Sequence, residues 1–277
     1  MKIGIVTRSF PEMTTAEAAD TMVKHGFKCT ELCFVQTDCN YWKYNGTSDI
    51  SGLSNEQVME IVNVYRSKGI EVTSIGVFTN LIEPDEETRK HNLEYFVKHI
   101  EYAAYCGIKY VATECGFIPG NRGVQAHTYE TAFNTMLESV KYLTKEAEKR
   151  DVYIAIEPCV LDVIPSAKRM RDFIYQCNSD RVKVLIDPAN LIANSSEEDM
   201  FKYLKDHIAY FHGKDRKVND TYGRVIGEGD IDWTVFLSLY KEYTPDVPFI
   251  LEYVNSKNCG EIKQRVMDYW EEIKDNR

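Results

Sequence analysis

The chain has 277 residues, of which 44% are hydrophobic and 27% charged, so it can bury a sizeable core and gives no compositional case for disorder. Its formal net charge of -10 argues against nucleic-acid binding, because an acidic surface repels a phosphate backbone. The N-terminal stretch MKIGIVTRSF lacks an apolar leader, no apolar run approaches the ~20 residues of a membrane span, and the eight cysteines form no CxxC pair. We therefore expect a cytoplasmic protein with reduced thiols that binds neither nucleic acid nor membranes.

Short β-rich runs alternate with longer amphipathic segments from one end of the chain to the other. Strands are expected at residues 2–6, 29–34, 72–77, 110–115, 152–157, 182–187, 208–213 and 248–253. A helix is expected after each of them, at residues 14–25, 54–68, 85–105, 128–149, 166–177, 196–206, 232–243 and 260–274. Thr14 with Glu17, and Ser54 with Gln57, have the spacing of capping boxes at the starts of the first two helices.

Eight strand-then-helix units without a linker or a shift in composition predict one domain over residues 1–277. Strands that alternate with helices form a parallel sheet, and eight such units in about 250 residues are what a closed (β/α)8 barrel requires. A doubly wound open sheet is the alternative, but the stretch GIVTRSF after the first strand has one glycine and no phosphate-binding loop. The (β/α)8 TIM barrel is therefore the expected fold.

The last four expected strands all end in a residue that can bind a metal ion. These residues are Glu157 in YIAIEP, Asp187 in VLIDP, His212 in AYFHGKD and Glu252 in FILEY. Neighbouring barrel strands lie about 4.8 Å apart, so side chains at matched heights on them can converge on one point. Three carboxylates that converge without a counter-charge repel one another and are forced to protonate. A divalent cation removes this conflict.

Carboxylate oxygens with one imidazole nitrogen suit Mn²⁺ best, and Mg²⁺, Co²⁺ and Zn²⁺ are alternatives; the lack of a thiolate speaks against a structural zinc. Each residue also has a purely structural explanation. Glu157 could form a salt bridge, Asp187 could cap its loop, His212 could be a core histidine and Glu252 could pair with a lysine. Because all four explanations must hold at four consecutive strand ends, we favour a site for one divalent ion.

The segments IAIEP, LIDPANL, FHGKDR, GEGDIDW and FILEY resemble the xylose isomerase-like TIM-barrel superfamily of sugar isomerases and epimerases, which includes ketose 3-epimerases and inosose dehydratases. The resemblance covers essentially the whole chain. It implies metal ligands at Glu157, Asp187, His212 and Glu252, with the two glutamates as the acid/base pair. It further implies proton transfer on a ketose or sugar phosphate through a metal-stabilised enediolate.

Four further residues are expected to contact the substrate. Asn190 stands where many ketose 3-epimerases have a histidine, and Arg216 is the candidate for their arginine after the strand-seven histidine. Lys214 should point to the same side as His212 if the strand continues, and either Lys214 or Arg216 could meet an anionic group. Glu114, at the end of the fourth strand, could contact a substrate hydroxyl or form a salt bridge.

Other functions remain open on this scaffold. A dehydratase of the inosose type would use the same metal site. An abasic-site endonuclease would need several histidines at strand ends, whereas only His212 of the six histidines ends a strand. A non-catalytic sugar-binding barrel is a third alternative. The expected partner is a small sugar or sugar phosphate, and the sequence is compatible with a homo-oligomer; it leaves the sugar and the reaction type open.

Overall fold

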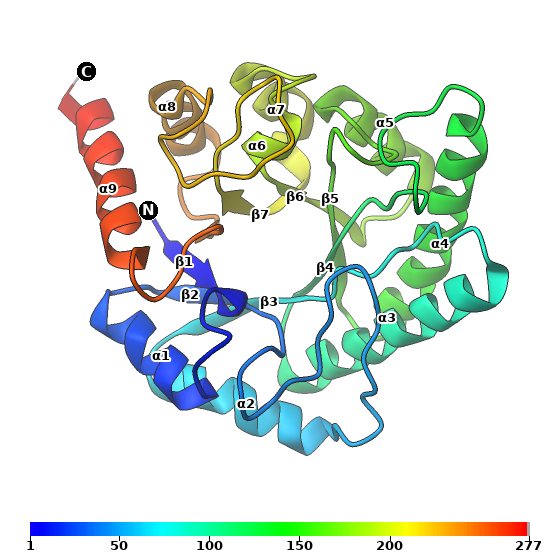
Figure 1. The fold of residues 1–277 in the computed structure, drawn as a ribbon, viewed down its shortest axis with the longest axis horizontal. Helices are drawn as coiled ribbons and strands as arrows, with labels where there is room; N and C mark the ends of the chain where they lie inside the picture. Colours follow the sequence, from blue (N-terminus) through cyan, green and yellow to red (C-terminus); the bar gives the residue numbers. More distant parts are fainter. Residues whose placement is uncertain (276–277) are drawn as a thin grey trace.

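The strands of this protein close into a barrel, and the helices form a ring around it (Figure 1). The computed structural model describes residues 1–275, and the strands found there follow one another around the barrel in chain order. The barrel closes where the first strand pairs in parallel with the last, with Ile3 opposite Phe249 and Ile5 opposite Leu251. The predicted (β/α)8 barrel is confirmed, and the open-sheet alternative is wrong.

Every predicted strand and helix is present, and its ends differ from the prediction by no more than two residues. The strands are β1 (Ile3–Val6), β2 (Cys29–Leu32), β3 (Glu71–Gly76), β4 (Tyr110–Glu114), β5 (Tyr153–Glu157), β6 (Val182–Ile186), β7 (Ile208–Gly213) and β8 (Phe249–Leu251). The predicted helices are α1 (Thr15–Lys24), α2 (Asn55–Ser67), α3 (Glu86–Cys106), α4 (Tyr129–Lys149), α5 (Ala167–Cys177), α7 (Glu197–Leu204), α8 (Trp233–Tyr243) and α9 (Cys259–Asp275).

Local hydrogen bonds explain why the helix starts were predictable. The Thr14 side chain accepts from the backbone N–H of Glu17, whose carboxylate accepts in turn from the N–H of Thr14; Ser54 and Gln57 form the same capping box.

Three short elements were not predicted, because one turn of helix has no apolar period of its own. They are η1 (Thr7–Ser9), α6 (Pro188–Leu191) and η2 (Lys205–His207).

The hydrophobic core has two layers. The larger layer lies between the strands and the helices, where Phe211 of β7 packs edge-on against Phe236 of α8 with ring centroids 5.8 Å apart. The smaller layer fills the inside of the barrel and consists of Val6, Cys29, Ala112, Ala155, Leu185, Ala209, Tyr210 and Ile250. This inner layer sets which residues face the barrel axis at the ends of the strands.

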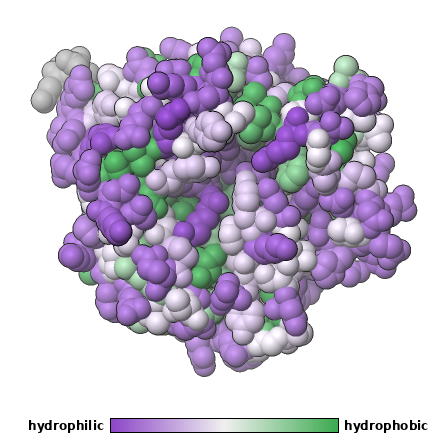
Figure 2. Space-filling view, viewed as in Figure 1, coloured by the Kyte–Doolittle hydropathy of each residue, from purple (hydrophilic) through white to green (hydrophobic). Residues whose placement is uncertain are grey.

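The surface has the polarity that amphipathic helices predict. In the space-filling view the exposed face is mainly hydrophilic, with small apolar areas scattered over it (Figure 2). All eight cysteines are buried and free. Among the helices of residues 1–275, none has both the length and the apolar character that crossing a membrane requires.

Candidate functional site

Polar side chains at the carboxyl ends of the strands continue the inward-facing rows of the inner core layer. In a strand, residues two apart face the same side. The site residues Glu31, Glu114, Glu157, Asp187, His212 and Glu252 follow the inner-layer residues Cys29, Ala112, Ala155, Leu185, Tyr210 and Ile250 at this spacing. Five of these six site residues are at most 1% exposed, and Glu114 is the exception. The barrel therefore brings buried carboxylates from several strands to one place.

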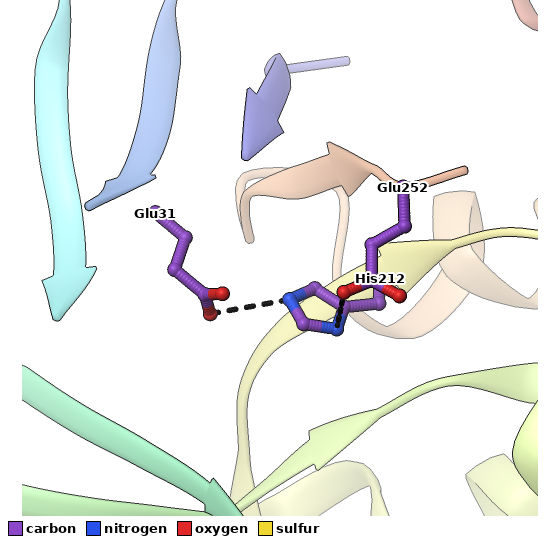
Figure 3. Close-up of side chains that lie close together, drawn as sticks. All are labelled: Glu31, His212 and Glu252. Carbon is purple, nitrogen blue, oxygen red and sulfur yellow. Dashed lines mark hydrogen bonds and ion pairs between the residues drawn. The ribbon is translucent and has the colours of Figure 1, made fainter. Parts of the chain in front are cut away.

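His212 of β7 lies among these carboxylates, with Glu31 and Glu252 on either side of its ring (Figure 3). Its Nε2 is 3.1 Å from a Glu31 oxygen, and its Nδ1 is 3.1 Å from Oε1 of Glu252 and 3.6 Å from Oε2 of Glu157. Burial by itself would lower the pKa of His212, but the charges of Glu31 and Glu157 outweigh it and raise the pKa to about 9. The ring is therefore protonated at neutral pH, with Nε2 hydrogen-bonded to Glu31 and Nδ1 at ion-pair distance from Glu252 and Glu157.

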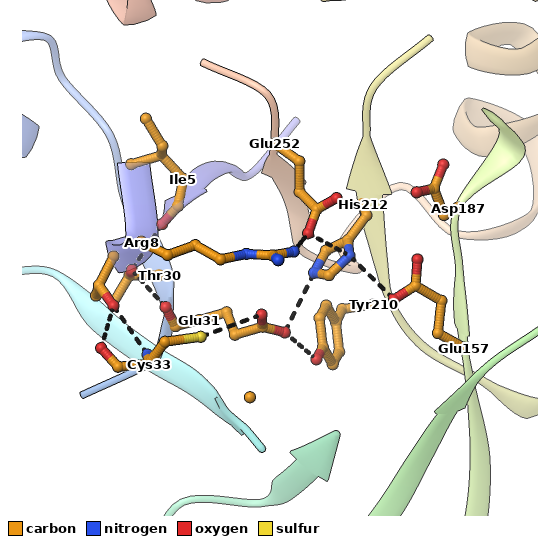
Figure 4. Close-up of polar contacts among 12 residues, drawn as sticks. Ile5, Arg8, Thr30, Glu31, Cys33, Glu157, Asp187, Tyr210, His212 and Glu252 are labelled. Carbon is orange, nitrogen blue, oxygen red and sulfur yellow. Dashed lines mark hydrogen bonds and ion pairs between the residues drawn. The ribbon is translucent and has the colours of Figure 1, made fainter. Parts of the chain in front are cut away.

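Glu31 on β2 is a member of the site that was not predicted. Its Oε2 accepts hydrogen bonds from Nε2 of His212 and from the hydroxyl of Tyr210, the latter at 2.5 Å (Figure 4). Burial opposes its ionisation, but the charges of His212 and Arg8 and these hydrogen bonds hold its pKa below the usual value. Glu31 lies on the second strand, far in the sequence from the four strand ends that predicted the site. The sequence signal for it is a charged residue inside the β-rich run CTELCF.

Asp187 uses its two oxygens differently. Oδ1 accepts a 2.9 Å hydrogen bond from the backbone N–H of Ala189 and caps the N-terminus of α6. Oδ2 faces the buried cluster, where it forms an ion pair with Lys214. Asp187 thus caps its loop, and it also leaves one oxygen for the site.

Lys214 lies on the same side of the chain as His212, as expected, but its ammonium contacts the carboxylates of the cluster. Its Nζ forms the ion pair with Asp187 and is 3.0 Å from Oε2 of Glu252 and 3.8 Å from Oε1 of Glu157. Burial would lower the pKa of Lys214, but the charges of Asp187 and Glu157 raise it above the usual value. Lys214 is therefore a cation that competes with a metal ion for these three carboxylates.

The residues present fit a divalent cation. Two overlapping groups have ligand atoms within 4.8 Å of one another: Glu157, Asp187 and His212 form the first, and Glu31, His212 and Glu252 form the second. Three atoms of the predicted ligands make no hydrogen bond to a described residue, namely Asp187 Oδ2, His212 Nδ1 and Glu252 Oε1. The three predicted ligands other than His212 are carboxylates, and Mn²⁺ and Mg²⁺ prefer oxygen ligands of this kind.

The balance of buried charge also favours a divalent ion. The four carboxylates of the two groups face two permanent cations, Lys214 and Arg8, the second of which forms an ion pair with Glu252. Two negative charges remain once His212 loses its proton, as it must to bind a metal through Nδ1. One divalent ion neutralises them. Glu31 holds the opposite nitrogen of His212, which is the position of an outer carboxylate that orients a metal-binding histidine.

A cavity of about 400 Å³ lies beside the cluster at the carboxyl ends of the strands. Six of the eight predicted site residues line it: Glu114, Glu157, Asn190, Lys214, Arg216 and Glu252. The other two, Asp187 and His212, are fully buried behind it. Glu157 and Glu252 are therefore the predicted ligands that reach both the cluster and the cavity.

Asn190 connects two of the lining residues. Its Nδ2 donates to Oε1 of Glu157 at 2.6 Å, and its Oδ1 accepts from Nη2 of Arg216 at 2.9 Å. Both ends of the amide are thus engaged within the protein. Asn190 positions the carboxylate of Glu157 and the guanidinium of Arg216 relative to each other.

A second polar group lines the cavity around Glu114, which lies next to Glu157 in the register of β4 and β5. Glu114 accepts a 2.7 Å hydrogen bond from the hydroxyl of Tyr44, and its other oxygen is 3.8 Å from Arg122, which also bonds Asp162 at 2.9 Å. Burial, together with the charge of Glu157, raises the pKa of Glu114. The salt-bridge alternative for Glu114 is thus present, and Glu114 also lines the cavity. Tyr44, Arg122 and Asp162 were not predicted, because they come from loops that show no periodic pattern.

Comparison with known proteins agrees with this architecture. Similar solved structures include a D-tagatose 3-epimerase-like protein, with 17% identity, a TM-score of 0.80, and coverage of 100% of this chain and 99% of that chain. The IOLI protein with a zinc atom has 17% identity and a TM-score of 0.76, with 99% and 98% covered. D-Psicose 3-epimerase from Clostridium cellulolyticum H10, solved with D-tagatose, has 16% identity and a TM-score of 0.72, with 99% and 98% covered. At these identities the likeness shows the fold alone.

No curated protein matches the sequence at a significant level. The family described as xylose isomerase-like TIM barrel matches residues 19–273, which include all the strands except β1 and every predicted site residue. Its match extends over nearly the whole barrel, and the chain therefore belongs to the xylose isomerase-like TIM-barrel family.

Proposed function

We propose that the protein is a divalent-metal-dependent enzyme that isomerises or epimerises a sugar by moving a proton at a carbon next to a carbonyl. The observation that supports this most directly is the placement of Glu157 and Glu252. Both carboxylates line the cavity, and both approach Nδ1 of His212, from strands on either side of β7. The names of the similar structures, among them two ketose 3-epimerases or epimerase-like proteins and one zinc-containing protein, point the same way.

In this proposal the two glutamates act on opposite sides of one substrate carbon. Burial would raise the pKa of Glu157, but Lys214 and His212 lower it to about 2, so Glu157 is ionised and can accept a proton at neutral pH. Glu252 has one oxygen beside His212 and the other beside Lys214. One carboxylate would remove the proton and the other would return it to the opposite face, which inverts the carbon. A bound divalent ion would supply the positive charge that stabilises the substrate oxygens as the proton leaves.

Deuterium incorporation tests this proposal. The full-length protein, loaded with Mn²⁺, is incubated in D₂O with ketoses, ketose phosphates and inososes, and the products are analysed by NMR. We expect deuterium at the carbon that is inverted or isomerised. Glu157→Gln and Glu252→Gln should each lower turnover by at least the ~10²-fold that is typical of losing a general base. Glu228→Gln, an exposed residue of the β7–α8 loop, is the matched control and should leave turnover unchanged. Product that forms without deuterium would contradict proton transfer and favour a hydride shift.

Glu114 supports a second candidate function, dehydration on the same site. Its raised pKa favours the protonated form, and it lies opposite Glu157 in the register of β4 and β5. A protonated carboxyl in the cavity can give its proton to a leaving hydroxyl. Mass spectrometry distinguishes the two reactions, because a dehydratase releases a product that lacks one water. In that case Glu114→Gln should abolish the loss of water more strongly than it slows deuterium exchange.

The abasic-site endonuclease is not supported by the geometry. Within the described residues, both groups that could hold a metal ion contain His212 as their single histidine. A site with several histidines, as a multinuclear zinc cluster would need, is not formed by these groups.

A further inference from the structure

Arg216 is a buried cation at the wall of the cavity, in the loop between β7 and α8. The residue is 4% exposed. Its Nη2 donates to the neutral amide oxygen of Asn190, whereas its Nε and Nη1 have no hydrogen-bond partner among the described residues. Among the described residues, no carboxylate oxygen lies within 4.0 Å of a guanidinium nitrogen of Arg216, the largest distance that counts as an ion pair.

The other cations that line the cavity differ in this respect. Each contacts a carboxylate: Arg8 contacts Glu252, Lys214 contacts Glu157 and Glu252, and Arg122 contacts Asp162. Burial removes the water that stabilises a guanidinium, so a buried arginine without a counter-charge costs free energy. A ligand anion at Arg216 would supply the missing charge.

The two carboxylates of this loop that are nearest to Arg216 in the sequence are already used. Asp215 accepts hydrogen bonds from four donors at 2.8 to 3.3 Å: the backbone N–H groups of Arg216, Gly227 and Ile231, and the indole of Trp233. Asp220 pairs with Arg224. These bonds fix the loop and hold Arg216 in position, and they leave its guanidinium without a described carboxylate at ion-pair distance. A fixed fork of N–H donors binds a carboxylate or a phosphate with little loss of side-chain entropy.

We propose that Arg216 binds an anionic group of the substrate, so that the sugar carries a carboxylate or a phosphate. The inference rests on the proposed function for the identity of the substrate as a sugar. Asn190 bridges Arg216 and Glu157 through bonds of 2.9 and 2.6 Å, so the anion lies one amide side chain away from the carboxylate that moves the proton. That separation fits within one monosaccharide, and a cavity of about 400 Å³ has room for one with its anionic group.

Calorimetric titration of the full-length protein tests the anion subsite without turnover. The probes are D-gluconate, inorganic phosphate and the neutral polyol D-glucitol. We expect gluconate or phosphate to bind more tightly than glucitol, and the preferred probe tells a carboxylate subsite from a phosphate subsite. Arg216→Gln should weaken that binding by about 10- to 100-fold, the effect of losing a charge-assisted hydrogen-bond pair. Arg216→Lys keeps the charge but not the fork of N–H donors, and its anion affinity should lie between those of wild type and Arg216→Gln. Circular dichroism checks that each variant is folded.

Lys217→Gln is the matched control, because Lys217 is the next residue in the chain, carries the same charge and has an exposed side chain. It should change anion affinity by less than about twofold. Equal weakening in Arg216→Gln and Lys217→Gln would overturn the subsite, since it would show general charge attraction only. Deuterium exchange on neutral ketoses without any anion binding would overturn the subsite and leave the proposed function standing. Anion binding that depends on Arg216, with no exchange on any sugar, would support the subsite and contradict the proposed function.

Discussion

Replacement of Glu31 by glutamine is expected to weaken metal binding, although Glu31 is not one of the predicted ligands. Glu31 accepts the 3.1 Å hydrogen bond from Nε2 of His212 and so directs Nδ1 toward Glu252 and Glu157. Glutamine keeps the shape of the side chain, and its oxygen can still accept from His212 and Tyr210. What it removes is the negative charge that makes the histidine a better ligand.

The size of the effect follows from that hydrogen bond. A bond to a charged group contributes about 1.5–3 kcal/mol and a neutral one about 1 kcal/mol, so the change costs about 0.5–2 kcal/mol. This corresponds to an increase of about 2- to 30-fold in the dissociation constant of the metal. This range overlaps the lower end of the ~10- to 100-fold that is usual for partners of metal-binding histidines.

Competition with a chromophoric chelator measures the dissociation constants of Mn²⁺ and Co²⁺ for wild type and variants. Tyr210→Phe removes the second hydrogen bond to Glu31 but keeps its charge, and should have a smaller effect than Glu31→Gln. Glu71→Gln, whose carboxylate is exposed and pairs with Lys2, is the control and should have no effect. A folded Glu31→Gln variant that binds both metals as tightly as wild type would refute the role given to Glu31.

Three more predictions concern the site, the core and the loop. Asp187→Asn should lose the roughly one metal ion per chain expected in protein purified without chelator, as measured by elemental analysis; unchanged content would show that Asp187 is not a ligand. Burial lowers the pKa of His99 from 6.5 to about 4, so the unfolded chain takes up a proton between these values that the folded chain does not. The contribution of the neutral His99 ring to the free energy of unfolding is complete above pH 6.5 and is lost as the pH falls toward 4. Between pH 7 and pH 5 this lowers the free energy of unfolding by about 2 kcal/mol. Urea titrations of wild type and His99→Gln should show this difference in pH dependence, and parallel curves would contradict it. Asp215→Asn leaves two of the four donors around it without an acceptor and should lower the free energy of unfolding by about 2–4 kcal/mol in the same assay, whereas a loss below about 0.5 kcal/mol would show that the loop does not depend on these bonds.

The order and ends of the main elements were visible in the sequence because local interactions determine them. The capping boxes at Thr14 and Ser54 mark the helix starts within the first turn, and short β-rich runs mark the strands. Closure of the barrel followed from the number of units. The short helix α6 was missed because its start at Asp187 depends on one cap and one proline, a signal that many loops share.

The inward direction of Glu157, Asp187, His212 and Glu252 could also be predicted, because side chains two apart in a strand share a face. Their contacts could not. Glu31 and His212 are separated by 181 positions in the chain, and they meet only because the pairing of β1 with β8 closes the barrel and brings β2 within three strands of β7.

The tertiary structure also decided which cation meets which anion. Lys214 was expected to reach a substrate, yet its ammonium contacts the buried carboxylates, while Arg216, two residues later, has none. Both are basic residues in the stretch GKDRK, so residue type does not separate them. The difference arises because a charge buried in a barrel interacts with every charge around it at low dielectric, and the strand register and the loop held by Asp215 fix those distances.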